Sequence, residues 1–196
     1  MALAKKHNLM VVDDCARSIL STYKGELVGT LADISVFSFE SKKHLSAGGE
    51  GGMIVSNNEE LAVKARKFAG IGYKHMTADA GRTHLAIDTV QDPSYKRFDT
   101  IGVNYRMNDI TAAIGMGQLQ RIDEIVGRRQ EVGKLFLEMT SGFEWFIPQA
   151  IPDNCTHSYY MFSVDYRGLE YFGVSWKEFY NRYKALGGDG FYGIVA

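Results

Sequence analysis

Two lysines stand in the segment Phe37-Ser-Phe-Glu-Ser-Lys-Lys-His44, between an apolar run and a group of four glycines. A lysine amine is a nucleophile only when it is neutral, and burial or nearby cations favour the neutral form. Such a lysine can form a Schiff base with an aldehyde. Lys43 is the candidate nucleophile, and Lys42 beside it is both a cation that can assist and a competing candidate.

The same segment can form a pocket for an anion. Ser38 stands at the end of the apolar run, where its hydroxyl and the N–H groups of the following turn are potential donors to a phosphate. The glycines of Gly48–Gly52 indicate positive φ angles or very close packing. A solvated basic turn that leads into the next strand explains these residues as well. On the pattern alone this second explanation is the stronger, because isolated glycine-rich loops are weak signals.

Asp14 follows the apolar run Leu9–Val12, which is typical of a buried parallel strand. A carboxylate at the carboxyl end of such a strand lies where α/β folds bind their ligands. A helix N-cap for the residues from Cys15 onward is the alternative. Position alone supports the two interpretations about equally.

The elements that would hold these residues alternate between strands and helices. Apolar runs predict strands over 9–12, 34–39 and 53–56, and helical spacing predicts helices over 59–70 and 108–139. A hairpin is expected around Gly25, and the polar stretch 71–103 is expected to be a long loop. This alternation predicts an α/β layer fold.

The character of the chain changes near residue 140. We therefore predict two units, 1–140 and 141–196, the second with a linker over 145–155, a strand over 158–164 and a helix over 176–186. His157 is interpreted as a structural histidine. The aromatic residues of this part are expected to form the core of a small domain: Tyr159, Tyr160, Phe162, Trp176, Phe179 and Tyr180.

Composition excludes several classes of function. The 22 basic and 23 acidic residues give a net charge of -1 and are scattered, which argues against nucleic-acid binding and attachment to an anionic membrane. No apolar run reaches the roughly 18 residues of a membrane span. Only two cysteines are present and no metal-ligand spacing occurs, so neither a disulfide scaffold nor a metal site is expected. A reducing cytoplasm is the expected compartment.

Three blocks of sequence together resemble the DegT/StrS-like family of nucleotide-sugar aminotransferases. The blocks are Val12-Asp-Asp-Cys-Ala-Arg17, Phe37–Lys43 with Gly49–Gly52, and Gly102-Val-Asn-Tyr-Arg-Met107 followed by Ala112-Ala113 and Gln118-Leu119. Members of this family depend on pyridoxal 5'-phosphate and have the aspartate aminotransferase-type fold, fold type I. The resemblance implies a three-layer α/β/α large domain, incomplete here, followed by part of a small α+β C-terminal domain.

The resemblance assigns roles to individual residues. Asp14 matches the aspartate that pairs with the pyridine nitrogen of the cofactor, and Ser38 matches a serine that binds its phosphate. Lys43, five residues after Ser38, matches the lysine of the internal aldimine. Asn104 matches an asparagine that reaches the phosphate site of a neighbouring subunit, which implies a homodimer. Arg17 stands near the expected cofactor ring, where the family more often has Gln or His.

The implied reaction moves an amino group from an amino acid, usually glutamate, to a keto sugar carried on a nucleotide. The family's N-terminal portion, with its phosphate loop and stacking aromatic residue, has no counterpart in this sequence, and the small domain stops early. We therefore expect a fragment or truncated product of such an enzyme.

Two alternatives remain. A related branch with the same cofactor removes a sugar hydroxyl and has histidine in place of the lysine; here His44 follows Lys43. The chain can also be a non-catalytic remnant that serves only as an interface or scaffold.

Overall fold

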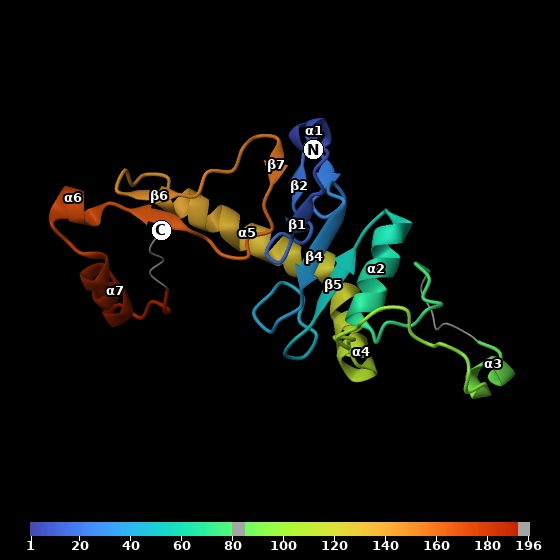
Figure 1. The fold of residues 1–196 in the computed structure, drawn as a ribbon. Helices are drawn as coiled ribbons and strands as arrows, with labels where there is room; N and C mark the ends of the chain where they lie inside the picture. The colour runs from blue at the N-terminus through green and yellow to red at the C-terminus, as the bar shows by residue number, and fades with distance from the viewer. Residues whose placement is uncertain (80–84, 192–196) are drawn as a thin grey trace.

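The computed structural model describes residues 1–79 and 85–191 of the chain. A short helix, α1 (Ala2–Lys6), begins the chain, and a central sheet follows it. The long helix α5 (Ile122–Thr140) runs from this sheet to the C-terminal elements at the opposite end of the molecule (Figure 1). In the described ranges, no helix is both long enough and apolar enough to cross a membrane.

The central sheet places the ends of two strands side by side. It has three strands in the order β1 (Val12–Asp14), β4 (Ile34–Ser38) and β5 (Gly52–Val55). β1 and β4 are parallel, with Asp14 opposite Val36, whereas β4 and β5 are antiparallel. Because parallel strands end at the same edge of a sheet, Asp14 and Ser38 lie at one edge.

The prediction of a buried strand over 9–12 is wrong in position and in burial. The strand begins at Val12, and the side chains of Leu9, Met10 and Val12 are 60%, 62% and 66% exposed. In the described residues β1 pairs only with β4, so it is an edge strand, and α1 buries none of its own residues. The apolar residues of β5 are exposed as well. One sheet with few covering elements leaves these side chains in contact with solvent.

A second sheet joins a segment near the N-terminus to a segment that follows α5. The predicted hairpin around Gly25 is confirmed as β2 (Thr22–Tyr23) and β3 (Glu26–Leu27), and Gly25 has φ 84°. β7 (Cys155–Thr156) pairs antiparallel with β2. The hydroxyls of Thr22 and Thr156 lie 2.9 Å apart. This pairing brings the C-terminal residues that follow β7 back to the central sheet.

The helix predicted over 59–70 is confirmed as α2 (Glu59–Ala69). The side chain of Asn58 accepts a hydrogen bond from the backbone N–H of Leu61, as expected of an N-cap. The segments 71–79 and 85–103 follow, and the second contains a short helix, α3 (Ile87–Gln91), which lies away from the sheet (Figure 1). Residues 80–84 of the predicted loop lie outside the described residues.

The single helix predicted over 108–139 is two helices. α4 (Asp109–Leu119) starts at Asn108, whose side chain caps Thr111 N, and α5 begins again at Ile122. The break aims α5 so that Ile122 and Val126 pack on Leu45 in the buried core of the described residues. No proline separates the two helices, and apolar residues continue at helical spacing across the break. The sequence therefore gives no signal for this break.

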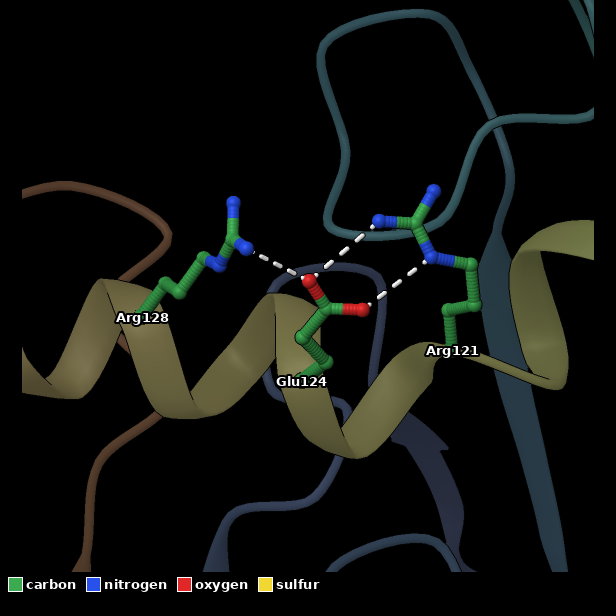
Figure 2. A network of polar contacts seen from close by, with 3 residues as sticks. All are labelled: Arg121, Glu124 and Arg128. Atoms are coloured by element: carbon green, nitrogen blue, oxygen red, sulfur yellow. Dashed lines mark hydrogen bonds and ion pairs between the residues drawn. The ribbon is translucent and has the colours of Figure 1, made fainter.

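The beginning of α5 carries an exposed ion-pair network. The Glu124 carboxylate accepts from Arg121 Nε at 3.1 Å and from Arg128 Nη2 at 2.7 Å (Figure 2). These bonds lower the pKa of Glu124, with Arg121 as the main cause. Acidic residues in a first turn also suit the helix dipole. The network thus favours a helix start at this point.

The C-terminal elements pack around aromatic side chains. They are the antiparallel pair β6 (Phe146–Pro148) and β8 (Val164–Tyr166), and the helices α6 (Gly168–Phe172) and α7 (Trp176–Ala185). Trp145 has five aromatic rings within 6.0 Å between centroids: Phe143, Phe146, Tyr166, Phe172 and Phe179. The predicted aromatic core is confirmed for Phe179, whereas Trp176 is 52% exposed.

Two boundaries in this part differ from the prediction. β6 lies inside the predicted linker 145–155, and the predicted strand over 158–164 is replaced by β8 at 164–166. α7 agrees with the predicted helix over 176–186. α5 ends at Thr140, where the boundary between 1–140 and 141–196 was placed; that division stays a prediction. Residues 192–196 of the second unit lie outside the described residues.

Candidate active site

Asp14 is the last residue of β1 and lies at the edge of the central sheet where β4 also ends. The strand is fixed there by a hydrogen bond from Cys15 N to Val36 O of 2.9 Å. The Asp14 carboxylate is exposed, and its Oδ1 accepts from Ala16 N at 3.0 Å. Asp14 therefore caps the turn after β1 through one oxygen, and the exposed carboxylate remains accessible from solvent.

The thiol next to Asp14 takes no part in such chemistry. Cys15 is 1% exposed, and burial, helped by the neighbouring Asp13 carboxylate, raises its pKa to about 11. A thiol with this pKa stays protonated near neutral pH and is a poor nucleophile. The reactive group at this edge must come from another element.

Ser38 is the last residue of β4, and a loop returns from it to β5. Its hydroxyl oxygen accepts from Glu40 N at 3.4 Å, and a hydroxyl that accepts one bond can still donate its own hydrogen. Backbone bonds close the loop from Phe39 N to Gly51 O at 2.7 Å and from Ser41 N to Gly49 O at 2.8 Å. The loop is therefore a defined structure at the end of the strand.

The glycine run lets this loop fold back on itself. Gly48 has φ 83° and Gly49 has φ 138°, both in the region that favours glycine. A Cβ on Gly48 would lie 2.8 Å from the side chain of Ile114 in α4, whereas nothing lies within 4 Å of the corresponding position on Gly49. Gly48 thus serves packing, and Gly49 leaves open space beside the loop.

Lys43 and Lys42 differ in their surroundings. Lys43 is half-buried, and its Nζ lies 4.8 Å from the centroid of the Tyr160 ring. Lys42 is exposed, and its backbone N–H donates to the Glu40 carboxylate, which also accepts from Ser41 Oγ. These two bonds lower the pKa of Glu40. The structure thus holds Lys43 against an aromatic ring, while Lys42 projects into solvent.

Arg17 reaches the same aromatic ring. Its guanidinium carbon lies 5.2 Å from the centroid of Tyr160, so Arg17 and Lys43 both contact this ring. The prediction that Tyr160 belongs to the small-domain core is wrong, because its ring contacts Lys43 and Arg17 at the candidate site. No local pattern marks it, because Tyr160 follows β7 and comes to Lys43 only through the pairing of β7 with β2.

His44, the neighbour of Lys43, makes a structural hydrogen bond to the backbone of Ser158. It is 3% exposed, and its Nε2 donates to Ser158 O at 2.9 Å. Burial is the main cause that lowers the pKa of His44, and the positive charges of Arg129, His157 and Lys43 lower it further. Burial also lowers the pKa of His157. His44 is therefore a neutral donor that ties the lysine loop to the residues after β7.

We expect the free energy of unfolding to fall as the pH is lowered below about 6.5, the ordinary histidine value. In that range the unfolded chain binds a proton at His44 that the folded chain resists, so the unfolded state binds more protons and stability is lost with falling pH. His44→Gln removes this titration and keeps an amide donor for Ser158 O. Urea unfolding at a series of pH values should therefore give a smaller slope for His44→Gln.

Exposed His7 offers a matched control for this experiment. His7→Gln makes the same substitution at an exposed position and so controls for the loss of a histidine side chain as such. His157 remains in both variants, so the slope in His44→Gln should be reduced and not abolished. Identical slopes for wild type and His44→Gln would contradict the assignment.

Asn104 is the predicted site residue that the structure leaves apart from the others. It is exposed, has φ 56°, and its Oδ1 accepts from Arg106 Nε at 2.8 Å. Its backbone N–H donates to Gly70 O at 2.7 Å. Within the described residues, no hydrogen bond links Asn104 to Asp14, Ser38 or Lys43. A role for Asn104 at a neighbouring subunit stays a prediction.

The residues at this edge suit pyridoxal 5'-phosphate as a ligand. The set offers a carboxylate at Asp14, a hydroxyl at Ser38 and an amine at Lys43, which match a protonated ring nitrogen, a phosphate and an aldehyde. The glycine loop adds open space at Gly49 and backbone N–H groups. The chemistry of the donor set therefore fits this cofactor.

Residues 1–170 match the DegT/DnrJ/EryC1/StrS aminotransferase family. Over 170 residues the chain is 35% identical to GDP-perosamine synthase of Escherichia coli O157:H7, an alignment that covers 86% of this chain and 41% of that protein. The chain thus spans about two fifths of the length of this relative.

Solved structures agree with this match. The aminotransferase of Psychrobacter cryohalolentis is 31% identical with a TM-score of 0.69, covering 82% of this chain and 41% of its own. The E. coli GDP-4-keto-6-deoxy-D-mannose-3-dehydratase with bound hydrated PLP has a TM-score of 0.77 at 20% identity, covering 95% of this chain and 46% of its own, which shows the shared fold alone. The resemblance and the α/β fold class read from the sequence are confirmed, and the chain belongs to the DegT/DnrJ/EryC1/StrS aminotransferase family.

Proposed function

We propose that this chain is the catalytic part of a pyridoxal-phosphate-dependent aminotransferase. The enzyme moves an amino group from an amino acid, glutamate, to a keto sugar carried on a nucleotide. The observation that carries the proposal is the placement of Asp14, Ser38 and the Lys43 loop at one edge of the central sheet, in a chain 35% identical to a GDP-perosamine synthase.

Each residue has a definite task in this proposal. When bound, pyridoxal phosphate supplies a ring that accepts electrons from the substrate carbon. Asp14 holds the proton on the ring nitrogen through its carboxylate. Ser38 donates its hydroxyl hydrogen to the phosphate, together with N–H groups of the loop. Lys43 would hold the aldehyde through Nζ, and its free amine would carry the proton from the substrate carbon to the cofactor carbon.

Arg17 adds a fixed positive charge near the ring. Its guanidinium cannot be deprotonated near neutral pH, so it can only stabilise an anion there. In the described residues, no carboxylate lies within ion-pair distance of Arg17 or Lys43. An anionic group of the cofactor or of a substrate is the natural partner for the Arg17 side chain.

The assembly proposed for the enzyme is a homodimer in the cytoplasm. The Asn104 side chain is exposed, and its amide N–H₂ group can donate outward while its oxygen accepts from Arg106. This arrangement supports a contact of Asn104 with the phosphate site of a second subunit. The site would then be complete only in the dimer.

The contacts of His44 speak against the dehydratase alternative. A histidine that replaces the reactive lysine must be free to move a proton at the cofactor. His44 is buried and donates to Ser158 O, whereas the amine of Lys43 lies at the ring of Tyr160. This difference supports lysine-dependent amino transfer.

Amino transfer is tested with purified protein, pyridoxal phosphate, L-glutamate and a GDP-linked 4-keto-6-deoxy sugar. We expect 2-oxoglutarate and a GDP-linked amino sugar in equal amounts, measured by mass spectrometry, because each amine lost by glutamate is gained by the keto carbon. Omitting the keto sugar should limit 2-oxoglutarate to one equivalent of bound cofactor. Loss of the sugar hydroxyl without amine gain would overturn the proposal in favour of dehydration.

A further inference from the structure

Tyr160 has no part in the proposed reaction, yet its ring is the centre of a cluster that includes Lys43 and Arg17. The Nζ of Lys43 lies 4.8 Å and the guanidinium carbon of Arg17 lies 5.2 Å from the centroid of its ring. The ring of His44 packs at 5.9 Å between centroids, tilted by 53°. Two predicted site residues from different strand ends therefore meet on one aromatic side chain.

Two cations are rarely placed together without an anion between them. In the ranges that the structure describes, neither Lys43 nor Arg17 has a carboxylate within ion-pair distance. The electron-rich face of an aromatic ring attracts a cation, most strongly where water is partly excluded. Lys43 is half-buried, so the Tyr160 ring adds to the weaker attraction that the Glu40 carboxylate exerts on its amine.

The backbone that carries Tyr160 is fixed on several sides. His44 Nε2 donates to Ser158 O at 2.9 Å, and Ser21 Oγ donates to Ser158 Oγ at 3.0 Å. Arg129 from α5 reaches the backbone oxygens of Tyr159 and Tyr160, at 3.3 Å each. Ser158 is fully buried. The position of the ring is thus set by the lysine loop, by the turn before β2 and by α5 together.

The ring of the preceding residue locks the same segment onto α5. Tyr159 is buried, and a Cβ on Gly133 would lie 2.7 Å from its ring atoms, so only glycine allows this contact. Tyr159 thus has a packing role, whereas the ring of Tyr160 is directed to the cations. The two consecutive tyrosines, Tyr159 and Tyr160, therefore have different roles.

We propose that Tyr160 is a positioning residue for Lys43, and this inference rests on the proposed function of Lys43. The flexible four-carbon stem of a lysine allows many positions of the amine. Contact with the ring selects those in which Nζ stays at the site, which lowers the entropy cost of covalent capture of the cofactor aldehyde. Tyr160 also covers the amine and so reduces its reaction with small electrophiles.

The test compares wild type with Tyr160→Leu and Tyr160→Phe. The first readout is reductive methylation of the protein without cofactor, with the Lys43 to Lys42 labelling ratio measured by peptide mass spectrometry. We expect this ratio to rise about threefold or more in Tyr160→Leu, because the amine loses its cover, and to stay near wild type in Tyr160→Phe, which keeps the ring. Exposed Lys42 serves as the internal reference.

The second readout is capture of pyridoxal phosphate, trapped with borohydride and titrated over cofactor concentration. The apparent dissociation constant should rise about tenfold in Tyr160→Leu and be restored in Tyr160→Phe. Unfolding would also expose Lys43, but it would raise the labelling of Lys67 as well, whose side chain is 19% exposed and ion-paired with Asp99. A variant in which Lys43 reacts faster with formaldehyde, Lys67 is unchanged and the cofactor is captured more weakly therefore shows lost positioning.

The two proposals fail in different ways. An unchanged Lys43 to Lys42 ratio in Tyr160→Leu overturns the role of Tyr160, whatever the cofactor does. Absence of cofactor capture at Lys43 in wild type overturns the proposed function, while a raised ratio would still show that the ring covers the amine. A rise in both Tyr160→Leu and Tyr160→Phe overturns the cation–π explanation.

Discussion

Replacing Lys43 with alanine is expected to abolish covalent capture of pyridoxal phosphate and to lower amino transfer by about 10³-fold or more. The variant loses both the amine that binds the aldehyde and the group that moves the proton at the substrate carbon. Capture is measured by borohydride trapping and peptide mass spectrometry, and by the absorbance of the protein–cofactor adduct. Transfer is measured by the formation of 2-oxoglutarate from glutamate.

Lys42→Ala is the matched control, because it removes the same side chain one position away. Lys42 is exposed, and only its backbone N–H contacts the Glu40 carboxylate, a bond that alanine keeps. Capture and transfer should therefore stay close to wild type. Loss of capture in Lys42→Ala with retention in Lys43→Ala would show that the two lysines have been assigned in the wrong order.

Asp14→Asn is expected to lower amino transfer by about 10²-fold to 10³-fold while the fold stays intact. Asparagine keeps an oxygen that can accept from Ala16 N, so the turn after β1 retains its cap. What is lost is the negative charge that keeps the cofactor nitrogen protonated. The substitution thus separates the two interpretations of Asp14, since a capping role needs only the oxygen and a cofactor role needs the charge.

The comparison uses steady-state transfer rates together with the urea midpoint of each variant. Asp13→Asn is the control, because this adjacent carboxylate interacts with the buried Cys15 thiol and has no part in the proposed site. It should leave the transfer rate near wild type. Full activity of Asp14→Asn would show that Asp14 only caps the turn. It would contradict the proposal that the charge of Asp14 keeps the cofactor nitrogen protonated.

Predictions from short-range sequence patterns are correct where neighbouring residues alone determine the local structure. The cap at Asn58 and the hairpin at Gly25 agree with the structure, because a side-chain oxygen near free N–H groups and a positive φ are properties of neighbouring residues. The same holds for the ends of the strands. Ser38 ends β4 and Asp14 ends β1, so their placement at one edge follows once the two strands are parallel.

The sequence was not sufficient to predict features that depend on packing between elements distant along the chain. The apolar spacing of 108–139 runs on through the break between α4 and α5, and only the contact of Ile122 and Val126 with Leu45 sets the direction of α5. The exposure of Val12 likewise depends on what packs against β1, which hydropathy does not encode.

The sequence by itself indicated the family and the candidate lysine, because three blocks of residues, which include Asp14, Ser38 and Lys43, resemble the family in order and spacing. It did not determine what surrounds that lysine. Tyr160, Arg17 and Lys43 meet only because β7 pairs with β2 and His44 binds Ser158, contacts between segments far apart in the chain. Such contacts leave no periodic signal along the sequence. Only the tertiary structure could therefore show that Tyr160 lies at the candidate site and not in the predicted core.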